Sequence, residues 1–236
     1  MRVMALDTTS RAGSVALIDD GRIVDERAGD ASRTHGERLP GELAALGVEW
    51  PSVDVFAVCA GPGSFTGLRI GIATIQGLAL VGGRPAVGVS ALEAVAQLAS
   101  RGLAEGDTIG VWIDAQRGEV FSALYRVAAG AVFTPERLLE IEAPAVAAPL
   151  ATMSAWSRYD LRSTVFAGDG IARHAPLLET AGVTRRLERP TLLAGAVGCM
   201  ASVRAERGLA ASPEAILPLY VRRPDAEIYR QRQAAR

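Results

Sequence analysis

The chain has 236 residues and a hydrophobic content of 49%, which indicate a folded globular protein. Its formal net charge is −1, so no overall electrostatic field attracts it to nucleic acid or to an anionic membrane. All 25 basic residues are arginine, so a Walker-type phosphate lysine, a Schiff base and a lysine general base are excluded together. His35 and His174, the two histidines, and the two cysteines form no H-x-x-x-H, H-E-x-x-H or C-x-x-C pattern. We therefore expect no metal site, no membrane span and a cytoplasmic location.

The first hundred residues predict alternating strands and helices. An apolar strand ends in Asp7, and Asp19-Asp20-Gly21 is a hairpin turn between two further strands. Pro40 interrupts a helical pattern that Gly47 ends, and Ser90 caps another helix. Strands are predicted at 3–6, 13–18, 22–26, 55–59 and 85–89, and helices at 35–46, 68–81 and 90–99. This order is typical of an α/β layered domain, which we place at residues 1–106 as the N-terminal lobe.

A second unit repeats the beginning of the first. Residues 111–124 (VWIDAQRGEVFSAL) resemble residues 4–17 (MALDTTSRAGSVAL), since both read as strand, aspartate, glycine-containing turn and strand. Chance similarity and a true internal repeat of two related lobes both remain open. In this C-terminal lobe, residues 107–221, strands are predicted at 109–113, 119–127, 164–167 and 217–221, helices at 171–181 and 192–207, and irregular structure at 128–160. Residues 222–236 are expected to form a flexible, arginine-rich tail.

Two aspartates stand where a nucleotide-binding site would need them. Asp7 and Asp114 each end a strand before a tight turn, which is the phosphate-loop arrangement of the actin-like ATPase and sugar-kinase fold. That arrangement has glycine two residues after the aspartate, whereas this chain has Thr9 and Gln116, whose side chains occupy the place of bare backbone. Two interpretations stay open. Asp7, Thr8, Thr9 and Asp114 are either a vestigial nucleotide site or structural residues whose aspartates cap amides in their own turns.

The glycine-rich segment GPGSFTG (61–67) joins a predicted strand to a predicted helix, where a helix N-terminus can bind an anion. Its spacing, G-x-G-x-x-x-G, is neither the dinucleotide fingerprint nor Walker A. An anion contact through Gly61, Gly63 and Ser64 is one interpretation, and a tight turn feeding a closely packed helix is the other. Ser64 and Thr66 have no histidine near them in sequence, so a Ser-His triad is not expected.

The predicted helix 68–81 is apolar nearly all round, with only Arg69, Thr74 and Gln76 interrupting it. A helix without a polar stripe must be covered on two sides, and the chain's own sheet covers one of them. Small residues recur four apart in this segment, at 67 and 71 and again at 73 and 77, which favours the close approach of another helix. We therefore favour a partner protein over a helix that is sandwiched within one subunit.

The segment AGPGSFTGLRIGIATIQGLAL (60–80) resembles the signature of the TsaB (YeaZ) family. Residues 4–17, HGERLP (35–40), IDAQRGEVF (113–121) and PLYVRR (218–223) fit the same family in the same order. The resemblance runs from residue 3 to about 223, with Cys59 and Ala60 as a departure where relatives often have Gly-Arg. It implies an α/β, two-lobed actin-like ATPase (ribonuclease H-like) fold, with two related mixed sheets flanked by helices, that has lost catalysis.

For function, the resemblance implies a non-catalytic subunit required for N6-threonylcarbamoyladenosine at position 37 of tRNA, one that scaffolds and activates a TsaD-like threonylcarbamoyltransferase. A TsaE-like ATPase joins the complex, tRNA is met through the complex, and the chain alone pairs with itself. The pairing is expected through helices 36–46 and 68–81. The interface residues expected from this are His35, Leu39, Leu43, Leu68, Gly71, Ile72, Ile75 and Leu78. No cofactor is expected to be tightly bound, and ATP or ADP with magnesium at the junction with the partner is left open.

Two other functions stay in view. The first is an active ATP-dependent phosphotransferase of the same fold that uses Asp7 and Asp114 with magnesium, against which Thr9 and Gln116 argue. The second is a glycoprotease-like peptidase, for which the sequence offers no nucleophile with a base.

Overall fold

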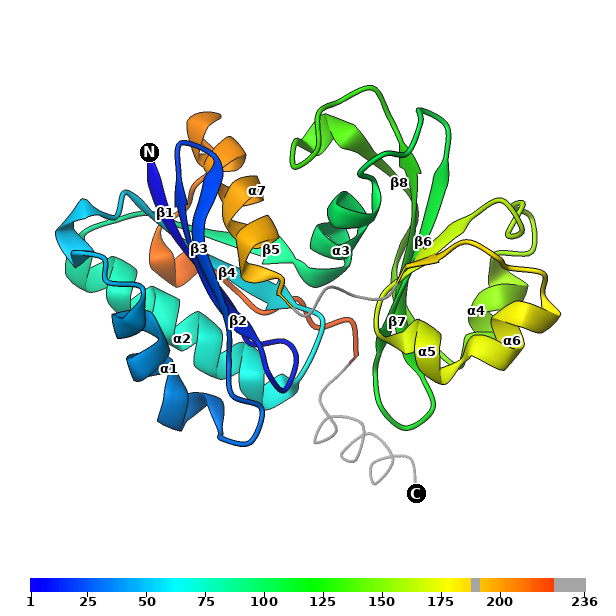
Figure 1. Ribbon diagram of the computed structural model, residues 1–236, viewed down its shortest axis with the longest axis horizontal. Coiled ribbons are helices and arrows are strands. Elements are labelled where there is room, and N and C mark those ends of the chain that lie inside the picture. Colours follow the sequence, from blue (N-terminus) through cyan, green and yellow to red (C-terminus); the bar gives the residue numbers. More distant parts are fainter. Residues whose placement is uncertain (188–191, 223–236) are drawn as a thin grey trace, which may run out of the picture.

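The computed structural model describes residues 1–187 and 192–222, which form two lobes, each built on a five-stranded sheet (Figure 1). The first sheet has the order β3-β2-β1-β4-β5, and the second has the order β10-β9-β6-β7-β8. Read in reverse, the second order is β8-β7-β6-β9-β10. The two orders are then the same, with β6 to β10 in the places of β1 to β5. The two-lobed α/β fold with two related mixed sheets is therefore confirmed, and the similarity of residues 4–17 and 111–124 marks a true repeat.

The first sheet is centred on two buried strands. β1 (Arg2–Asp7) pairs antiparallel with β2 (Ser14–Asp19) and parallel with β4 (Val55–Gly61). β4 is buried along its whole length, as expected for a continuous apolar run with neighbours on both sides. β3 (Arg22–Ala28) is an exposed, charged edge strand, and β5 (Ala86–Ser90) forms the other edge.

Three helices from the first hundred residues lie beside this sheet. α1 (His35–Ala45) begins with a capping box of Thr34 and Glu37 and tolerates Pro40 in its second turn. After the short η1 (Trp50–Ser52), α2 (Phe65–Gly82) is capped by Ser64 and ends at Gly83, whose φ of 60° is left-handed. α3 (Ala91–Ala99) is capped by Ser90 and is almost entirely buried. These helices agree with the sequence prediction to within three residues at each end.

The second lobe differs more from its prediction. β6 (Thr108–Asp114), β7 (Val120–Val127) and the short β9 (Val165–Ala167) are close to the predicted strands. The stretch predicted to be irregular instead contains η2 (Pro135–Arg137), the edge strand β8 (Leu138–Ala147) and α4 (Pro149–Ala155). The single helix predicted at 171–181 is broken at His174 into α5 (Gly170–Arg173) and α6 (Ala175–Thr180), with β10 (Arg186–Leu187) after them.

The last α-helix in the described part of the chain packs on the first sheet. α7 (Ala194–Glu206) packs on β1, β2 and β4, although the sequence analysis assigned all of residues 107–221 to the second lobe. Gly198 permits this close approach, because a Cβ there would lie 2.0 Å from the Cδ1 atom of Ile18. η3 (Pro213–Ala215) follows, and residues 217–221 form no strand in the part of the chain that is described. Of the predicted tail, all but Arg222 lies outside the described residues.

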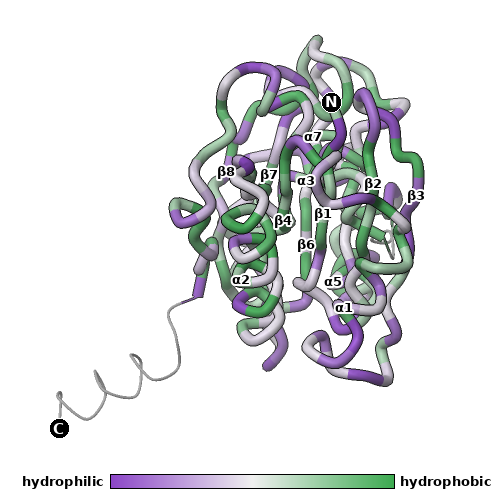
Figure 2. The backbone as a smooth tube through the Cα atoms, turned by 90° about the vertical axis from the view of Figure 1, so that its left-hand side faces the viewer, coloured by the Kyte–Doolittle hydropathy of each residue, from purple (hydrophilic) through white to green (hydrophobic). Residues whose placement is uncertain are grey.

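One apolar cluster joins the two lobes. It contains residues from β1, β4, α3, β6, β7 and α7, so α3 and α7 fill the space between the two sheets (Figure 1). A second cluster lies between the first sheet and the pair α1 and α2, and a third lies between the second sheet and α4 to α6. Figure 2 views the molecule from the side of the first lobe. The continuous core explains why the two lobes form one body.

Candidate functional site

The first aspartate turn is closed by its own side chains. Asp7 ends β1 with only 1% of its surface exposed, and its Oδ1 atom accepts hydrogen bonds from the Thr9 amide at 2.8 Å and the Thr9 hydroxyl at 2.6 Å. Thr8 and Thr9 are buried as well. Thr9 therefore caps the carboxylate at the position where a phosphate-binding turn would expose bare backbone.

The glycine-rich segment packs directly onto this turn. The Ser64 amide donates to the Thr9 carbonyl at 2.9 Å, and the Thr8 hydroxyl donates to the Gly67 carbonyl at 2.8 Å. A Cβ at Gly67 would lie 2.1 Å from the Thr8 carbonyl oxygen, and one at Gly71 would lie 2.2 Å from the Thr8 hydroxyl. These two glycines thus admit the chain's own first turn rather than another helix, which corrects the role that the sequence analysis gave them. Gly61 and Gly63 lie in the same packed segment.

The second aspartate turn is more open. Asp114 ends β6, and its Oδ1 atom accepts from the Gln116 amide at 2.9 Å while its Oδ2 atom accepts from Arg173 at 3.0 Å. Gln116 and Arg117 are exposed and have left-handed φ angles of 61° and 56°. The Asp114 carboxylate is thus engaged by an arginine side chain of the same protein. Both aspartates cap amides in their own turns, as one of the two interpretations of the sequence predicted.

A buried arginine joins α1 to the first hairpin. Arg38 is 3% exposed, and its guanidinium donates to both carboxylate oxygens of Glu42, at 2.6 and 2.7 Å, and to the Ala12 carbonyl. His35 lies against the same guanidinium, and burial, followed by the charge of Arg38, lowers the pKa of its imidazole. The sequence analysis missed Arg38, although a Glu four residues after an Arg on a helix was a visible signal.

The side chains expected to meet a partner mostly face inward. Phe56 and Val58 of β4 belong to the same apolar cluster as four of them. The eight expected residues divide into six that are buried, namely Leu39, Leu43, Leu68, Gly71, Ile72 and Ile75, and two, His35 and Leu78, that are partly buried. The face of α2 that the sequence analysis assigned to a partner therefore lies against the chain's own sheet and first turn.

The opposite side of α2 is open to solvent and still apolar. We call it the α2 face and define it by Phe65, Arg69, Ala73, Gly77, Leu80 and Val81. Leu80 is 59% exposed and Val81 93%, and a Cβ at Gly77 would have no neighbour within 4 Å. By length and composition alone, α2 is long and apolar enough to cross a membrane, although the sequence analysis expected no such segment. A third of its residues are buried in the fold. A single such helix is weak evidence of a membrane protein, and in Figure 2 its visible turns are mainly green and white.

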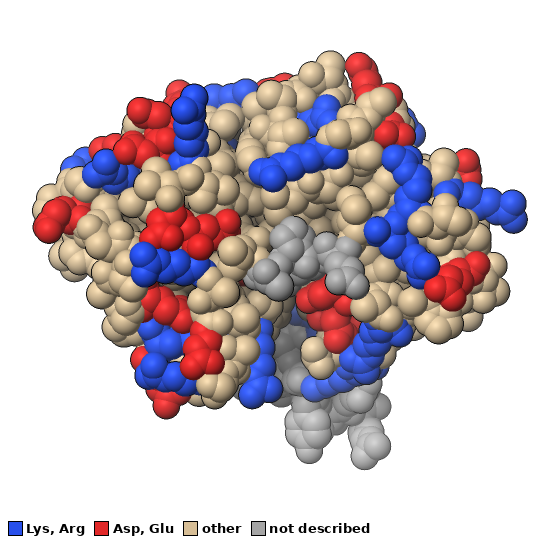
Figure 3. Space-filling model, viewed as in Figure 1, with Lys and Arg blue, Asp and Glu red and all other residues tan. Residues whose placement is uncertain are grey.

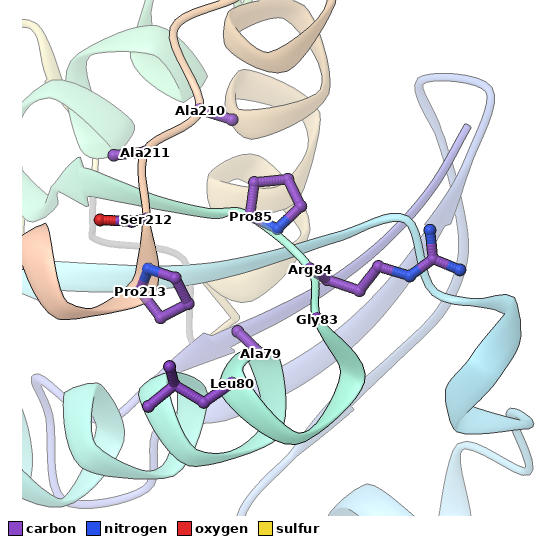
Figure 4. Close-up of a pocket in the computed structure, with 9 residues that line it drawn as sticks. All are labelled: Ala79, Leu80, Gly83, Arg84, Pro85, Ala210, Ala211, Ser212 and Pro213. Carbon is purple, nitrogen blue, oxygen red and sulfur yellow. The ribbon is translucent and has the colours of Figure 1, made fainter.

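Two hollows among the described residues are lined mainly by apolar residues and gather no cluster of catalytic groups. A hollow of about 370 Å³ lies at the C-terminal end of α2, beside β5 and η3 (Figure 4). Its lining has one hydroxyl, from Ser212, and the Arg84 side chain points away from the other labelled residues to donate to the Pro51 carbonyl at 3.0 Å. On the surface in Figure 3, arginines and acidic residues are interspersed over both lobes, without a broad field of one sign.

Comparisons with known proteins place this geometry in a family. Residues 29–230 match the family model described as TsaD: tRNA N6-adenosine threonylcarbamoyltransferase. The tRNA threonylcarbamoyladenosine biosynthesis protein TsaB of Escherichia coli is 40% identical over 130 residues, which cover 53% of this chain and 55% of that protein. An uncharacterized protein of Mycobacterium tuberculosis is 30% identical over 231 residues, covering 95% of this chain and 93% of its own length.

Solved structures agree with these relatives. An uncharacterized Pseudomonas aeruginosa protein with similarity to peptidase YEAZ superimposes with a TM-score of 0.74 at 30% identity, covering 94% of this chain and 99% of that one. YeaZ from Pseudomonas aeruginosa gives a TM-score of 0.72 at 29% identity, covering 93% and 99%. The chain spans about half the length of the first curated relatives it matches, those of Escherichia coli and Haemophilus influenzae.

Proposed function

This chain belongs to the TsaB (YeaZ) family, and on that premise we propose that it is a non-catalytic subunit for N6-threonylcarbamoyladenosine synthesis on tRNA. In this proposal it holds and activates a TsaD-like threonylcarbamoyltransferase, together with a TsaE-like ATPase. Relatives in Escherichia coli, Haemophilus influenzae and Bacillus subtilis carry the name tRNA threonylcarbamoyladenosine biosynthesis protein TsaB, which supports this assignment.

The exposed apolar face of α2 carries the proposal. Removing Leu80 and Val81 from water would contribute about 1.5–3 kcal/mol for each fully buried side chain. The open backbone at Ala73 and Gly77 would let a partner helix approach closely, as small residues do at packed helix pairs. A stable complex of standard size buries about 1,600 Å² in total, so residues around the α2 face must take part as well.

The hydrogen bonding of both aspartate turns supports a role without catalysis. In the first turn, the Thr9 hydroxyl donates a hydrogen bond to the Asp7 carboxylate, and both residues are buried under the start of α2. In the second turn, Arg173 contacts the carboxylate of Asp114. In each turn the amide two residues after the aspartate, at Thr9 and at Gln116, already donates to that aspartate and is not open to a phosphate.

Reconstitution tests the proposal. The chain would be combined with a TsaD-like paralogue, a TsaE-like ATPase, the threonylcarbamoyl group in its AMP-linked form, ATP and tRNA, and each component would be left out in turn. We expect modified adenosine, detected by mass spectrometry of digested tRNA, to depend on this chain, and we expect the chain alone not to hydrolyse ATP. Robust hydrolysis by the chain alone that Asp7→Ala abolishes would instead establish a phosphotransferase or ATPase.

A substitution on the α2 face tests the contact itself. Gly77→Arg should abolish co-elution with the TsaD-like partner in size-exclusion chromatography, because a long charged side chain would stand in the contact. The free chain should stay folded, since Gly77 has open space around it and most residues favour a helix more than glycine does. Gly77→Ala and Ala155→Arg, the latter at an exposed position of α4, are the matched controls and should co-elute normally. Unchanged co-elution of Gly77→Arg would place the contact elsewhere.

A further inference from the structure

The segment Leu217–Arg222 crosses from the first lobe to the second after η3 (Figure 1). We propose that this segment, here called the clasp, braces the second aspartate turn against the start of α2. This inference concerns the chain alone and does not depend on the proposed partner.

One end of the clasp is fixed to the first lobe by a backbone hydrogen bond. The Leu219 amide donates to the Ala60 carbonyl at 2.7 Å, at the end of β4. The Leu219 carbonyl oxygen lies 3.1 Å from where a Cβ on Gly61 would stand, so the chain crosses close over the glycine-rich segment. Just before the clasp, the Gln76 amide of α2 donates to the carbonyls of Pro213 and Ile216, each at 3.1 Å. This part of the chain is thus held along the flank of α2.

An aromatic contact fixes the middle of the clasp. The rings of Tyr220 and Phe65 stack with centroids 5.6 Å apart, and the guanidinium of Arg69 lies 4.0 Å from the centroid of the Phe65 ring. Arg69 also donates to the Tyr220 hydroxyl at 3.1 Å. Since Phe65 and Arg69 are in the first two turns of α2, Tyr220 ties the clasp to the N-terminal end of that helix.

Arg222 carries the connection into the second lobe. Its guanidinium donates to the Ala115 carbonyl at 2.9 Å, forms an ion pair with Glu119 and lies 5.6 Å from the centroid of the Phe121 ring. Ala115 and Glu119 flank the second aspartate turn, so one side chain contacts both of its ends.

The second turn needs such a brace because its backbone is strained. Gln116, Arg117 and Gly118 have φ angles of 61°, 56° and 77°, and only the last of them is a glycine. A residue other than glycine persists in this conformation when its surroundings hold it there. Within the turn, the Ala115 amide donates to the Glu119 carbonyl at 3.1 Å and the Glu119 amide to the Gln116 carbonyl at 3.0 Å. The exchange of these two amides therefore reports whether the turn is held.

Hydrogen exchange of the isolated chain tests the clasp, with Tyr220→Ala as the decisive variant. Its ring packs on first-lobe residues, yet we expect the amides of Ala115 and Glu119 in the second lobe to exchange roughly three- to tenfold faster, as the loss of an aromatic pair allows. Arg222→Gln should accelerate the same amides by at least as much. A denaturant titration of each variant checks that the fold is intact.

Two controls separate a brace from local effects. Leu217→Ala changes a 70% exposed side chain at the start of the clasp and should leave the exchange unchanged. Arg173→Ala removes the ion pair with Asp114 without touching the clasp, which calibrates a purely local loosening of the turn. If Tyr220→Ala leaves the Ala115 and Glu119 amides at wild-type rates, the clasp does not brace the turn and the inference is overturned.

Discussion

The two lobes begin with the same hairpin but use it differently. In each lobe the first strand ends in an aspartate that caps an amide two residues later, at Thr9 in one and Gln116 in the other. Asp7 is buried, whereas the Asp114 side chain is 22% exposed and paired with Arg173. The same topology therefore produces a sealed turn in the first lobe and an accessible one in the second.

The difference comes from what packs on each turn. An 18-residue helix rests on the first turn, because Gly67 and Gly71 remove the Cβ atoms that would meet Thr8. In the second lobe, the corresponding loop after β9 leads into the four-residue α5, and its Gly168 packs under the backbone of Trp112 instead. The repeat thus preserved the strands, while the lengths and glycines of the following helices set the access to each turn.

The largest expected effect lies within α2 itself. Gly67→Ala and Gly71→Ala should each destabilise the chain by about 2–4 kcal/mol, because the new methyl group would overlap Thr8. Gly77→Ala, on the same helix, should stabilise it by about 0.5–1 kcal/mol, since its Cβ has open space and alanine favours a helix. Denaturant unfolding of the three variants measures this. Equal effects at all three positions would contradict the packing of the glycines on the first turn.

A smaller effect should distinguish the two aspartates. Asp7→Ala should cost about 2–3 kcal/mol, because it removes a buried acceptor of two hydrogen bonds from Thr9. Asp114→Ala should cost about 1 kcal/mol, because water can reach its partners. Thermal or denaturant unfolding gives both values. If Asp114→Ala proved the more damaging, the second turn and not the first would be the more tightly built.

The smallest effect concerns pH and involves one histidine in each lobe. Burial is the main cause of the lowered pKa of His35, and it is also the main cause at His174. The unfolded chain, where a histidine titrates near 6.5, therefore binds more protons than the folded chain just below that pH. Stability should fall as pH drops through 6.5 toward 5, and His35→Gln and His174→Gln should each reduce that loss by less than about 1 kcal/mol.

Denaturant unfolding at pH 8 and pH 5.5 measures this loss for the wild type and both variants. Comparing variants isolates the histidines from Glu26, whose pKa burial raises and which acts in the opposite direction. If both variants lose as much stability as the wild type between pH 8 and pH 5.5, groups other than these histidines cause the loss.

Much of the fold could be read from local patterns. Apolar runs that end in Asp7 and Asp114 identified both hairpins, and the serine cap at Ser90 identified the start of α3. The start of α2 was predicted three residues late because the cap at Ser64 was not recognised. The strand β8 was missed because it is an edge strand with three alanines and a proline and only two β-branched residues to reveal it. The assignment of α7 to the first sheet was missed because only tertiary packing decides which sheet a buried helix covers.

The orientation of α2 could not be predicted. A helix that is apolar all round has no polar stripe, so its sequence does not indicate which side faces the sheet. The small residues at Gly67 and Gly71 seemed suited to a partner, but they accommodate Thr8, and the exposed pair is Ala73 and Gly77. Spacing identified the helix as unusual, whereas the position of the first turn decided which of its sides stayed open.

The placement of α7 bears on how the protein matures as it leaves the ribosome. The strands β1, β2 and β4 are made first, yet the helix that covers one of their faces ends at Glu206. Until those last residues emerge, that sheet exposes apolar side chains such as Ile18 to the surrounding solution. The first lobe therefore cannot mature ahead of the second during synthesis, and a nascent chain that stalls before residue 194 is expected to require chaperone protection.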